Sequence, residues 1–391
     1  MKKETKKAPT IRFRGFTDDW KQRKLGDIVD FLDTQRKPLT ENIREKGPYP
    51  YYGASGIVDY VAGYIFDEEL VLLSEDGANI TDRNYPVCFL ASGKYWVNNH
   101  AHVLKTKEGI DNNFICNSLE CKDFSIYNTG MAMPKLNQDI CKRIPVDFPT
   151  YDEQENIGNY FRDIDYFITL HQRKLDQLKK LKKYFLQNMF PAKGEKVPRI
   201  RFKGFTGDWE QRKLGDICGV YDGIHQTPDY QEDGVMFLSV ENIATLTSEK
   251  YISEDAYNRN YKAYPEKGDI LMTRIGDVGT PHVVETNEKL AYYVSLALLK
   301  PKGIDSYFLN NAIQTSPFQK GLLERTLLTA IPMKINKDEI GKVDISFPVN
   351  ISEQKQIGSY FRNLDNLITL HQRKLNQLQT MKKFMLQNLF I

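Results

Sequence analysis

The sequence predicts an α+β protein in which two mixed α/β domains are separated by two long helices. The helices are expected to form an antiparallel coiled coil, and the whole is expected to be pseudo-two-fold symmetric. Three observations lead to this fold class. Two segments each occur twice in the 391 residues, the stretches between them are mostly unrelated, and one repeated segment carries a heptad pattern of apolar residues.

The shorter repeated segment covers residues 11–28 and 200–217. IRFRGFTDDWKQRKLGDI returns as IRFKGFTGDWEQRKLGDI, with differences only at Arg14/Lys203, Asp18/Gly207 and Lys21/Glu210. A duplication that drifted freely would differ at similar rates everywhere. A nearly fixed frame around different inserts instead suggests that the two inserts have the same kind of function but act on different targets.

The inserts, roughly residues 29–147 and 218–346, share only a few matching residues. Gly77 matches Gly276, and Lys135-Leu136-Asn137 matches Lys334-Ile335-Asn336. Short β-rich runs such as 70–73, 103–105 and 270–273 alternate with Gly and Pro, which is typical of short strands in an α+β domain.

The longer repeated segment, 153–175 and 353–375, ends both times in ITLHQRKL and predicts a helix. Apolar residues spaced alternately by four and three form the a and d positions of a seam. The seam contains Ile157, Phe161, Ile164, Ile168, His171, Leu175, Leu178, Ile357, Phe361, Leu364, Ile368, His371, Leu375 and Leu378. About 38 residues make a rod of roughly 57 Å. We expect the two seam histidines to fix register rather than bind a metal, because no further ligands are suitably spaced.

The short connection between the halves predicts the direction of the helix pair. The linker 191–199 runs straight from the first helix into the second half. An antiparallel pair needs no chain to return along the rod, whereas a parallel pair does. Pseudo-two-fold symmetry then places segment 11–28 near the C-terminus, because its twin, 200–217, follows the end of the first helix.

These patterns divide the chain into six parts. They are a flexible N-terminal tail (1–10), a first domain that includes segment 11–28 (11–149), a first spacer helix (150–190), a linker (191–199), a second domain that includes segment 200–217 (200–348), and a second spacer helix (349–391).

Composition and absent motifs favour a binding protein over an enzyme. The formal net charge is +3, the five cysteines show no metal-ligand spacing, and free thiols are expected. We find no phosphate-binding loop, HExxH or GxSxG sequence. The basic N-terminus lacks the apolar stretch of a signal peptide and no run is long enough to span a membrane, so a cytoplasmic protein without a membrane or metal partner is expected.

Polar loops of the two inserts are the candidate DNA contacts. Gln side chains suit adenine, Arg side chains suit guanine, and Lys suits phosphate. For each of these residues a plain loop or core role is the alternative. The candidates are Thr34, Gln35, Arg36, Lys37, Arg83, Asn84, Asn98, Asn99, His100 and Lys135 in the first insert, and His225, Gln226, Thr227, Arg274, Tyr292, Tyr293, Thr329 and Lys334 in the second.

The paired IRFxGFTxDWxQRKLGDI blocks, the paired ITLHQRKL helices and the DGIHQTP and MTRIGDVG runs resemble the specificity (S) subunits of type I restriction-modification enzymes. The resemblance covers nearly all of 11–391. It implies a non-catalytic subunit of a host-defence system whose two target-recognition domains each read half of a bipartite, asymmetric DNA site, with the helices fixing the gap.

The same resemblance implies the partners. Two modification subunits would use S-adenosylmethionine to methylate adenine, and restriction subunits would add ATP- and Mg²⁺-dependent translocation and cleavage. No cofactor is expected on this chain. Two other classes remain open at this point: a single-chain enzyme that modifies or cuts DNA, and a coiled-coil scaffold that binds proteins.

Overall fold

The computed structural model describes residues 8–391 and divides into two units, which are taken one at a time. Unit 1 contains the residues up to Gln172 together with Arg373–Ile391, and unit 2 contains Arg173–Gln372. Each unit holds one mixed domain, the first part of one long helix and the last part of the other. The tail predicted over residues 1–10 falls mostly on residues 1–7, outside the described residues.

The domain of unit 1, domain 1, is built from short strands and short helices. Its strands are β1 (Lys21–Lys24), β2 (Val29–Phe31), β3 (Lys46–Gly53), β4 (Gly56–Val61), β5 (Phe66–Asp67), β6 (Leu70–Ser74), β7 (Cys88–Ala91), β8 (Lys94–Val97), β9 (Ala101–Thr106) and β10 (Pro145–Phe148). Its helices are α1 (Leu25–Ile28), α2 (Asn79–Asp82), α3 (Asn112–Glu120) and α4 (Gln138–Cys141), with 3-10 turns η1 (Asp33–Gln35), η2 (Glu41–Ile43) and η3 (Phe124–Tyr127).

The domain of unit 2, domain 2, follows the same plan with different lengths. Its strands are β11 (Glu210–Lys213), β12 (Cys218–Asp222), β13 (Val235–Leu238), β14 (Tyr251–Ile252), β15 (Ile270–Ile275), β16 (Asp277–Val283), β17 (Leu290–Tyr292), β18 (Leu296–Pro301) and β19 (Asp344–Phe347). Its helices are α6 (Leu214–Ile217), α7 (Glu254–Asn260), α8 (Ser306–Ile313), α9 (Ser316–Leu323) and α10 (Lys337–Gly341), with the 3-10 turn η4 (Val240–Asn242).

One four-stranded sheet has the same order in both domains. In domain 1 the order is β2-β9-β6-β7, and in domain 2 it is β12-β18-β15-β16, with every pair antiparallel. The two-stranded pairs β1-β10 and β11-β19 also correspond. The second sheets differ, with order β4-β3-β8-β5 in domain 1 and β14-β13-β17 in domain 2. The domains therefore share a frame and diverge outside it.

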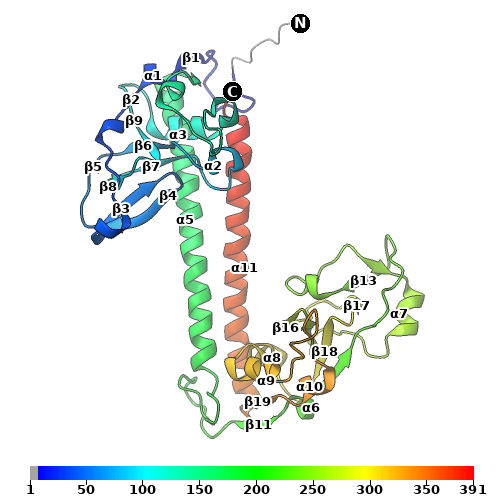
Figure 1. Ribbon diagram of the computed structural model, residues 1–391. Coiled ribbons are helices and arrows are strands. Elements are labelled where there is room, and N and C mark those ends of the chain that lie inside the picture. The colour runs from blue at the N-terminus through cyan, green and yellow to red at the C-terminus, as the bar shows by residue number, and fades with distance from the viewer. Residues whose placement is uncertain (1–7) are drawn as a thin grey trace. The chain divides into compact units, whose positions relative to one another are not determined.

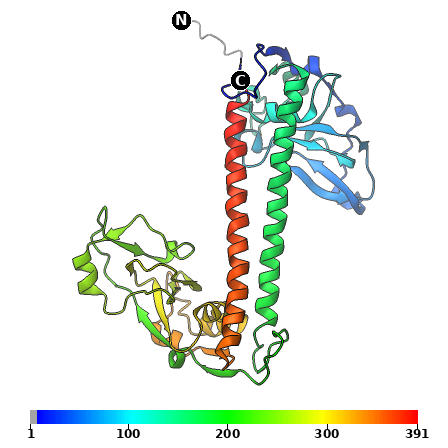
Figure 2. The same cartoon turned by 180° about the vertical axis from the view of Figure 1, so that it is seen from behind.

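The two long helices, α5 (Tyr151–Asn188) and α11 (Ile351–Asn388), pack together in antiparallel fashion (Figures 1 and 2). In unit 1, Asp165 of α5 forms an ion pair with Lys382 of α11 at 2.6 Å. In unit 2, Lys182 forms the matching pair with Asp365 at 2.7 Å. Rising numbers on one helix thus meet falling numbers on the other, which confirms the predicted fold class.

The expected seam positions lie inward along both helices. Most of the apolar seam residues are buried, and Ile168 and Ile368 are half-buried with the histidines His171 and His371. Solvent-exposed positions lie between them, as the heptad pattern requires.

Each long helix ends inside the core of the domain at that end. Phe390 at the end of α11 packs against Trp20 and Phe114 in domain 1, at ring-centroid distances of 6.4 and 5.4 Å. Phe190 at the end of α5 packs in the same way against Trp209 and Phe308 in domain 2, at 5.9 and 5.4 Å. Buried aromatic contacts of this kind join helix and domain into one core.

The shorter repeated segment connects each helix end to its domain. The Ile11 N–H donates to the Asn388 carbonyl at 2.9 Å, and the Ile200 N–H donates to the Asn188 carbonyl at 2.8 Å. The first bond confirms the predicted place of segment 11–28 beside the end of the second helix. The second bond is its twin after the first helix.

Candidate DNA interface

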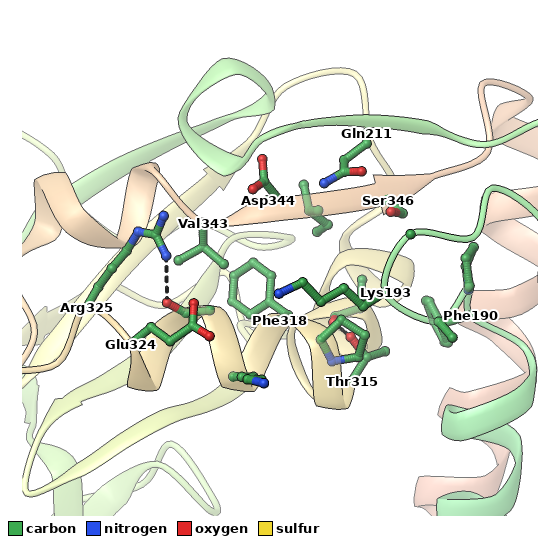
Figure 3. Close-up of a pocket in the computed structure, with 18 residues that line it drawn as sticks. Phe190, Lys193, Gln211, Thr315, Phe318, Glu324, Arg325, Val343, Asp344 and Ser346 are labelled. Atoms are coloured by element: carbon green, nitrogen blue, oxygen red, sulfur yellow. Dashed lines mark hydrogen bonds between the residues drawn. The ribbon is translucent and has the colours of Figure 1, made fainter.

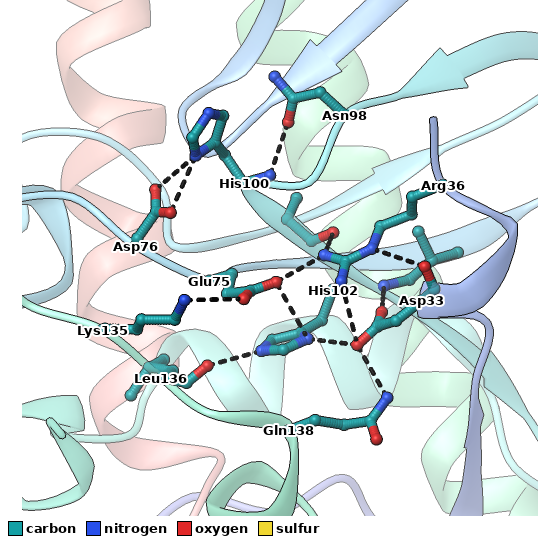
Figure 4. A network of polar contacts seen from close by, with 12 residues as sticks. Asp33, Arg36, Glu75, Asp76, Asn98, His100, His102, Lys135, Leu136 and Gln138 are labelled. Carbon is teal, nitrogen blue, oxygen red and sulfur yellow. Dashed lines mark hydrogen bonds and ion pairs between the residues drawn. The ribbon is translucent and has the colours of Figure 1, made fainter. Parts of the chain in front are cut away.

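Domain 1 presents a loop, residues 34–40, that begins at a buried carboxylate (Figure 4). Asp33 accepts hydrogen bonds from the Val103 N–H and from Gln138 Nε2, both at 2.9 Å, and lies 2.6 Å from His102 Nδ1. Burial acts to raise the pKa of Asp33, but the hydrogen bond and charge of His102, the Val103 N–H and the charge of Arg36 together lower the pKa below its ordinary value. Asp33 is therefore an anionic anchor for this segment, here called the QRK loop.

The partner of this carboxylate is His102, whose side chain is 1% exposed on β9. Its Nδ1 faces Asp33, and its Nε2 lies 2.7 Å from the Leu136 carbonyl oxygen. Both neighbours are acceptors, so both ring nitrogens donate and the ring is an imidazolium. Burial alone would lower the pKa of His102, but Asp33 and Cys141 raise it to about 10. A buried cation thus joins the start of the QRK loop to Leu136.

Arg36 from the QRK loop belongs to the same network. Its guanidinium donates to Glu75 Oε2 at 2.6 Å, to the Ala101 carbonyl at 2.7 Å and to the Asp33 carbonyl at 3.1 Å. Lys135 Nζ lies 3.4 Å from the other oxygen of Glu75. The guanidinium of Arg36 is engaged within the domain, which favours a role in holding the loop over contact with a base.

Other candidates surround this network. Thr34, Gln35 and Lys37 are exposed on the QRK loop. His100 is exposed beside Asp76, with 2.9 Å between Nδ1 and the carboxylate, and its N–H donates to buried Asn98. Asn99 is exposed between them, and Lys135 is exposed on the neighbouring loop. The structure therefore brings most domain 1 candidates to one edge of the domain.

Arg83 and Asn84 lie elsewhere. Arg83 donates to the backbone and to the carboxylate of Glu120, and lines a cavity with Cys121 and two lysines of α11. Asn84 follows it in the exposed turn after α2. The structure does not join this pair to the QRK loop network.

In domain 2 the matching segment, residues 222–230, borders an open groove. His225, Gln226 and Thr227 are exposed and line a groove of about 560 Å³, with Arg259 of α7 contributing to the lining. This segment is called the HQT loop. It begins at Asp222, as the QRK loop begins at Asp33.

Asp222 also has a buried cationic partner. Arg274 at the end of β15, which is 5% exposed, forms an ion pair with Asp222 and donates from Nε to the Ile335 carbonyl at 3.0 Å. His225 Nε2 lies 4.0 Å from the same carboxylate. Arg274 is therefore placed to hold the start of the HQT loop through Asp222.

The remaining domain 2 candidates divide between core and surface. Tyr292 is buried and donates to the Asp222 carbonyl at 3.0 Å, and Tyr293 is half-buried 6.0 Å from the ring of Phe237. Thr329 and Lys334 are exposed on the loop that precedes α10. The two tyrosines thus support the HQT loop, while Thr329 and Lys334 face solvent.

The apolar residues of two loops were not among the sequence candidates, although Lys135, Thr329 and Lys334 of the same loops were. In domain 1 a turn closed by the Thr129 N–H and the Lys135 carbonyl, 2.8 Å apart, presents Met131 and Met133 to solvent. In domain 2 a turn closed by Leu327 and Lys334 presents Leu328 and Ile331. These turns, residues 129–135 and 327–334, are called tip loops. Large apolar residues in a Gly/Pro-containing turn are the sequence signal that could have identified them.

A smaller pocket lies in unit 2 at the end of α5 (Figure 3). Its volume is about 160 Å³, and its lining includes Phe190, Lys193, Lys320, Glu324 and Asp344. Charges of both signs line it, and its lining includes no residue of the HQT loop or of the tip loop. It is therefore separate from the candidate DNA contacts.

Two further kinds of feature, metal-binding clusters and membrane-spanning helices, do not occur in residues 8–391. Within that range no group of three or more His, Cys, Asp or Glu side chains is arranged to hold a metal ion. No helix described there combines the length and apolarity needed to cross a bilayer. Cys88, Cys116, Cys121, Cys141 and Cys218 are all free thiols, as expected.

Comparison with known proteins gives one consistent relationship. A protein of Haemophilus influenzae, named provisionally as a type I restriction enzyme specificity subunit, is 27% identical over 366 residues, covering 90% of this chain and 89% of that protein. The MjaVIII type I restriction enzyme specificity subunit of Methanocaldococcus jannaschii is 22% identical over 393 residues, covering 94% and 91%. The crystal structure of the type I restriction-modification S subunit from M. genitalium has the same fold, with a TM-score of 0.76, 14% identity, and coverage of 98% and 99%.

The family model for the type I restriction modification DNA specificity domain matches the chain twice, over residues 17–180 and 206–380. Each match contains one domain and most of the long helix that follows it. Members of this family are non-catalytic DNA-recognition subunits. The chain belongs to the family of type I restriction-modification DNA specificity subunits.

Proposed function

We propose that domains 1 and 2 each read one half of a bipartite, asymmetric DNA site. The observation that carries this proposal is the shared sheet with different loop chemistry. The QRK loop offers Gln35 and Lys37 where the HQT loop offers Ile224 and Gln226. Loops that leave the shared sheet at equivalent points thus present different side chains, and base readout depends on the groups that such side chains offer.

The long helices act as the spacer in this proposal. Each is continuous over 38 residues, or roughly 57 Å, and the Lys182–Asp365 and Lys382–Asp165 pairs hold their register. A fixed register keeps the gap between half-sites constant. The division into residues 11–149, 150–190, 191–199, 200–348 and 349–391 is proposed on the same basis.

The DNA contacts proposed are of two kinds. Exposed Gln35, Lys37 and Lys135, with Gln226 and Lys334 in domain 2, suit base edges and phosphates. The apolar tips suit base steps, since apolar side chains that enter a groove partly unstack the bases they touch. Both kinds lie on loops next to the shared sheet.

Two modification subunits are the proposed partners on the helices. In unit 1, exposed Phe167 and Leu170 of α5 share a face with Met381 and Phe384 of α11, because g and c positions of antiparallel helices lie on one side. Unit 2 repeats this patch with Leu181, Tyr184, Leu367 and Leu370. Two similar apolar patches at equivalent positions fit two copies of one partner.

The chemistry of the complex belongs to the partners in this proposal. The modification subunits bring S-adenosylmethionine for adenine methylation, and the restriction subunits bring ATP and Mg²⁺ for translocation and cleavage. Double-stranded DNA is the shared substrate, and the cytoplasm is the proposed compartment.

The test is a genome-wide map of methylated adenines in cells that express the chain with its modification subunit. The expected map shows one motif made of two different half-sites with a constant gap. The modification subunit alone is the control and should leave no such motif. A motif without two halves, or a motif that persists without the chain, would contradict the proposal.

A further inference from the structure

The equivalent positions of the two domains can be assigned from backbone contacts. Leu136 N–H donates to the Glu75 carbonyl at 2.7 Å, and Ile335 N–H donates to the Arg274 carbonyl at 3.0 Å. Glu75 and Arg274 therefore occupy the same place. Asp33 and Asp222 also correspond, because each is the fifth residue after the LGDI block.

In both domains one buried side chain bridges a carboxylate and a backbone carbonyl oxygen. In domain 1 His102 joins the Asp33 carboxylate to the Leu136 carbonyl, at 2.6 and 2.7 Å. In domain 2 Arg274 joins the Asp222 carboxylate to the Ile335 carbonyl, the latter at 3.0 Å. The acceptors match position by position, and both bridging side chains are buried cations.

The bridging cation comes from a different strand in each domain. His102 lies on β9 opposite Leu73, and the equivalent place on β18, opposite Met272, is Ala297. Arg274 lies on β15, and its equivalent after β6 is Glu75. Domain 1 thus has Glu75 with His102, and domain 2 has Arg274 with Ala297.

The residue that pairs with Glu75 also differs between the two domains. Arg36 neutralises Glu75 in domain 1 at 2.6 Å. Its equivalent in domain 2, the eighth residue after LGDI, is His225, which is exposed. Where the bridge is Arg274, no acidic residue stands at the Glu75 position and no arginine is needed to pair with it.

We propose that this buried cation bridge is a positioning device for DNA reading, built in two interchangeable ways. It locks the start of the QRK or HQT loop onto the end of the tip loop, so that two DNA-contacting loops keep a fixed separation. The inference rests on the proposed function. His102 and Arg274 touch no DNA in this account and act through the loops they hold.

The first test removes the bridge from domain 1. His102→Ala, expressed with the modification subunit, should raise adenine methylation at sites with one wrong base in the first half-site by about tenfold relative to the correct site. The second half-site and the gap should remain unchanged. Lys105→Ala is the matched control, since Lys105 is exposed on the same strand and pairs with Glu68.

The second test rebuilds the bridge from the other strand. The triple variant His102→Ala, Glu75→Arg, Arg36→His gives domain 1 the residues of domain 2 and should restore first half-site fidelity. In domain 2, Arg274→Ala should relax only the second half-site. The variant Arg274→Glu, Ala297→His, His225→Arg should restore it.

The outcomes separate the alternatives. Full first half-site fidelity in a folded His102→Ala complex would overturn the proposal. If that complex fails to fold, the triple variant decides: restored folding and fidelity support the bridge, and lost folding or lost fidelity overturns it. Thermal unfolding of each purified complex identifies which case holds. A wild-type map without a bipartite motif would instead defeat the proposed function itself.

Discussion

At the scale of single residues, the repeated Arg of the IRF segments has a clear role. Arg12 donates from Nε and Nη2 to both carboxylate oxygens of Glu153 at 2.7 Å, and Arg201 binds Glu353 in the same way. Each glutamate is 1% exposed. The bond joins the shorter repeated segment to the start of the long helix, which explains why both segments recur together.

Removing this arginine should therefore destabilise unit 1. Arg12→Ala leaves a buried carboxylate without its charge partner, which typically costs about 3–5 kcal/mol. Urea unfolding of the purified chain measures the loss. Arg12→Lys should recover only part of it, because an ammonium cannot bind both oxygens in the same plane. A loss no larger than that of an exposed control, Lys107→Ala, would contradict this role.

The buried imidazolium of His102 predicts a dependence of stability on pH. Its pKa is about 10 in the folded chain, against an ordinary value of 6.5. The stability it contributes is therefore full below about pH 6.5 and is lost as pH rises towards 10, by an amount on the order of a few kcal/mol. Urea unfolding between pH 6 and 10 tests this. The triple variant with an arginine bridge should lose less stability over that range, and an equal loss in both would contradict the assignment.

Residue roles were only partly predictable from sequence. The polar side chains of the QRK and HQT loops predict DNA contacts, and several of those side chains face solvent. Arg36 and Arg274 look like base-reading arginines in the sequence, yet their guanidinium groups are engaged inside the domains. Asp33 and His102 lie 69 positions apart, and no local pattern signals a pairing that depends on strand order.

At the scale of elements, a glycine in each long helix marks a close approach. A Cβ at Gly158 would lie 2.2 Å from Asp111 Oδ1, and one at Gly358 would lie 2.6 Å from Asp305 Oδ1. Asp111 and Asp305 cap α3 and α8 by accepting from Phe114 N–H and Phe308 N–H. The glycines therefore let each long helix press against the N-terminus of a domain helix.

This geometry reverses the usual effect of a helical Gly→Ala change. Such a change normally stabilises by about 1 kcal/mol, but Gly158→Ala should destabilise by about 1–3 kcal/mol because the Asp111 cap must move. Urea unfolding against wild type gives the sign. Gln177→Ala on the exposed face of the same helix is the control, with little change expected. A more stable Gly158→Ala chain would show that the contact is not tight.

The tip loops give a prediction about DNA affinity. Met131 is fully exposed, so Met131→Ser should leave folding unchanged. If its side chain packs on a base step, the change should weaken binding of the complex to its mapped site by about tenfold. Fluorescence titration with a labelled duplex measures this. Ile126→Ser, at another exposed apolar position of domain 1, should have no effect, and equal effects of both changes would argue against a specific contact.

Helices were more predictable than sheets. The heptad pattern predicted two long helices, and the structure has them as Tyr151–Asn188 and Ile351–Asn388. Apolar runs also located β6, β9 and β15. Strand order was not predictable, because pairs such as β2 with β9 join segments distant in sequence. In the tip loops the polar residues Lys135, Thr329 and Lys334 are candidates from sequence, but the exposed apolar residues are not, because apolar side chains more often indicate a core role.

At the scale of the whole molecule, duplication accounts for the division of labour. The repeated segments make the helix pair and its attachment to each domain, and the inserts make the loops. The ion pairs Lys182–Asp365 and Lys382–Asp165 are the same contact formed twice. A nearly identical frame thus carries two different readers, and either reader can change without altering the frame.

The most direct measurement exchanges one reader. Residues 29–147 are replaced by the corresponding insert of another family member, and methylated adenines are mapped in cells that also express the modification subunit. The account predicts a new first half-site, with the second half-site and the gap unchanged. A change in both half-sites, or in the gap, would contradict the independence of the two domains on a common spacer.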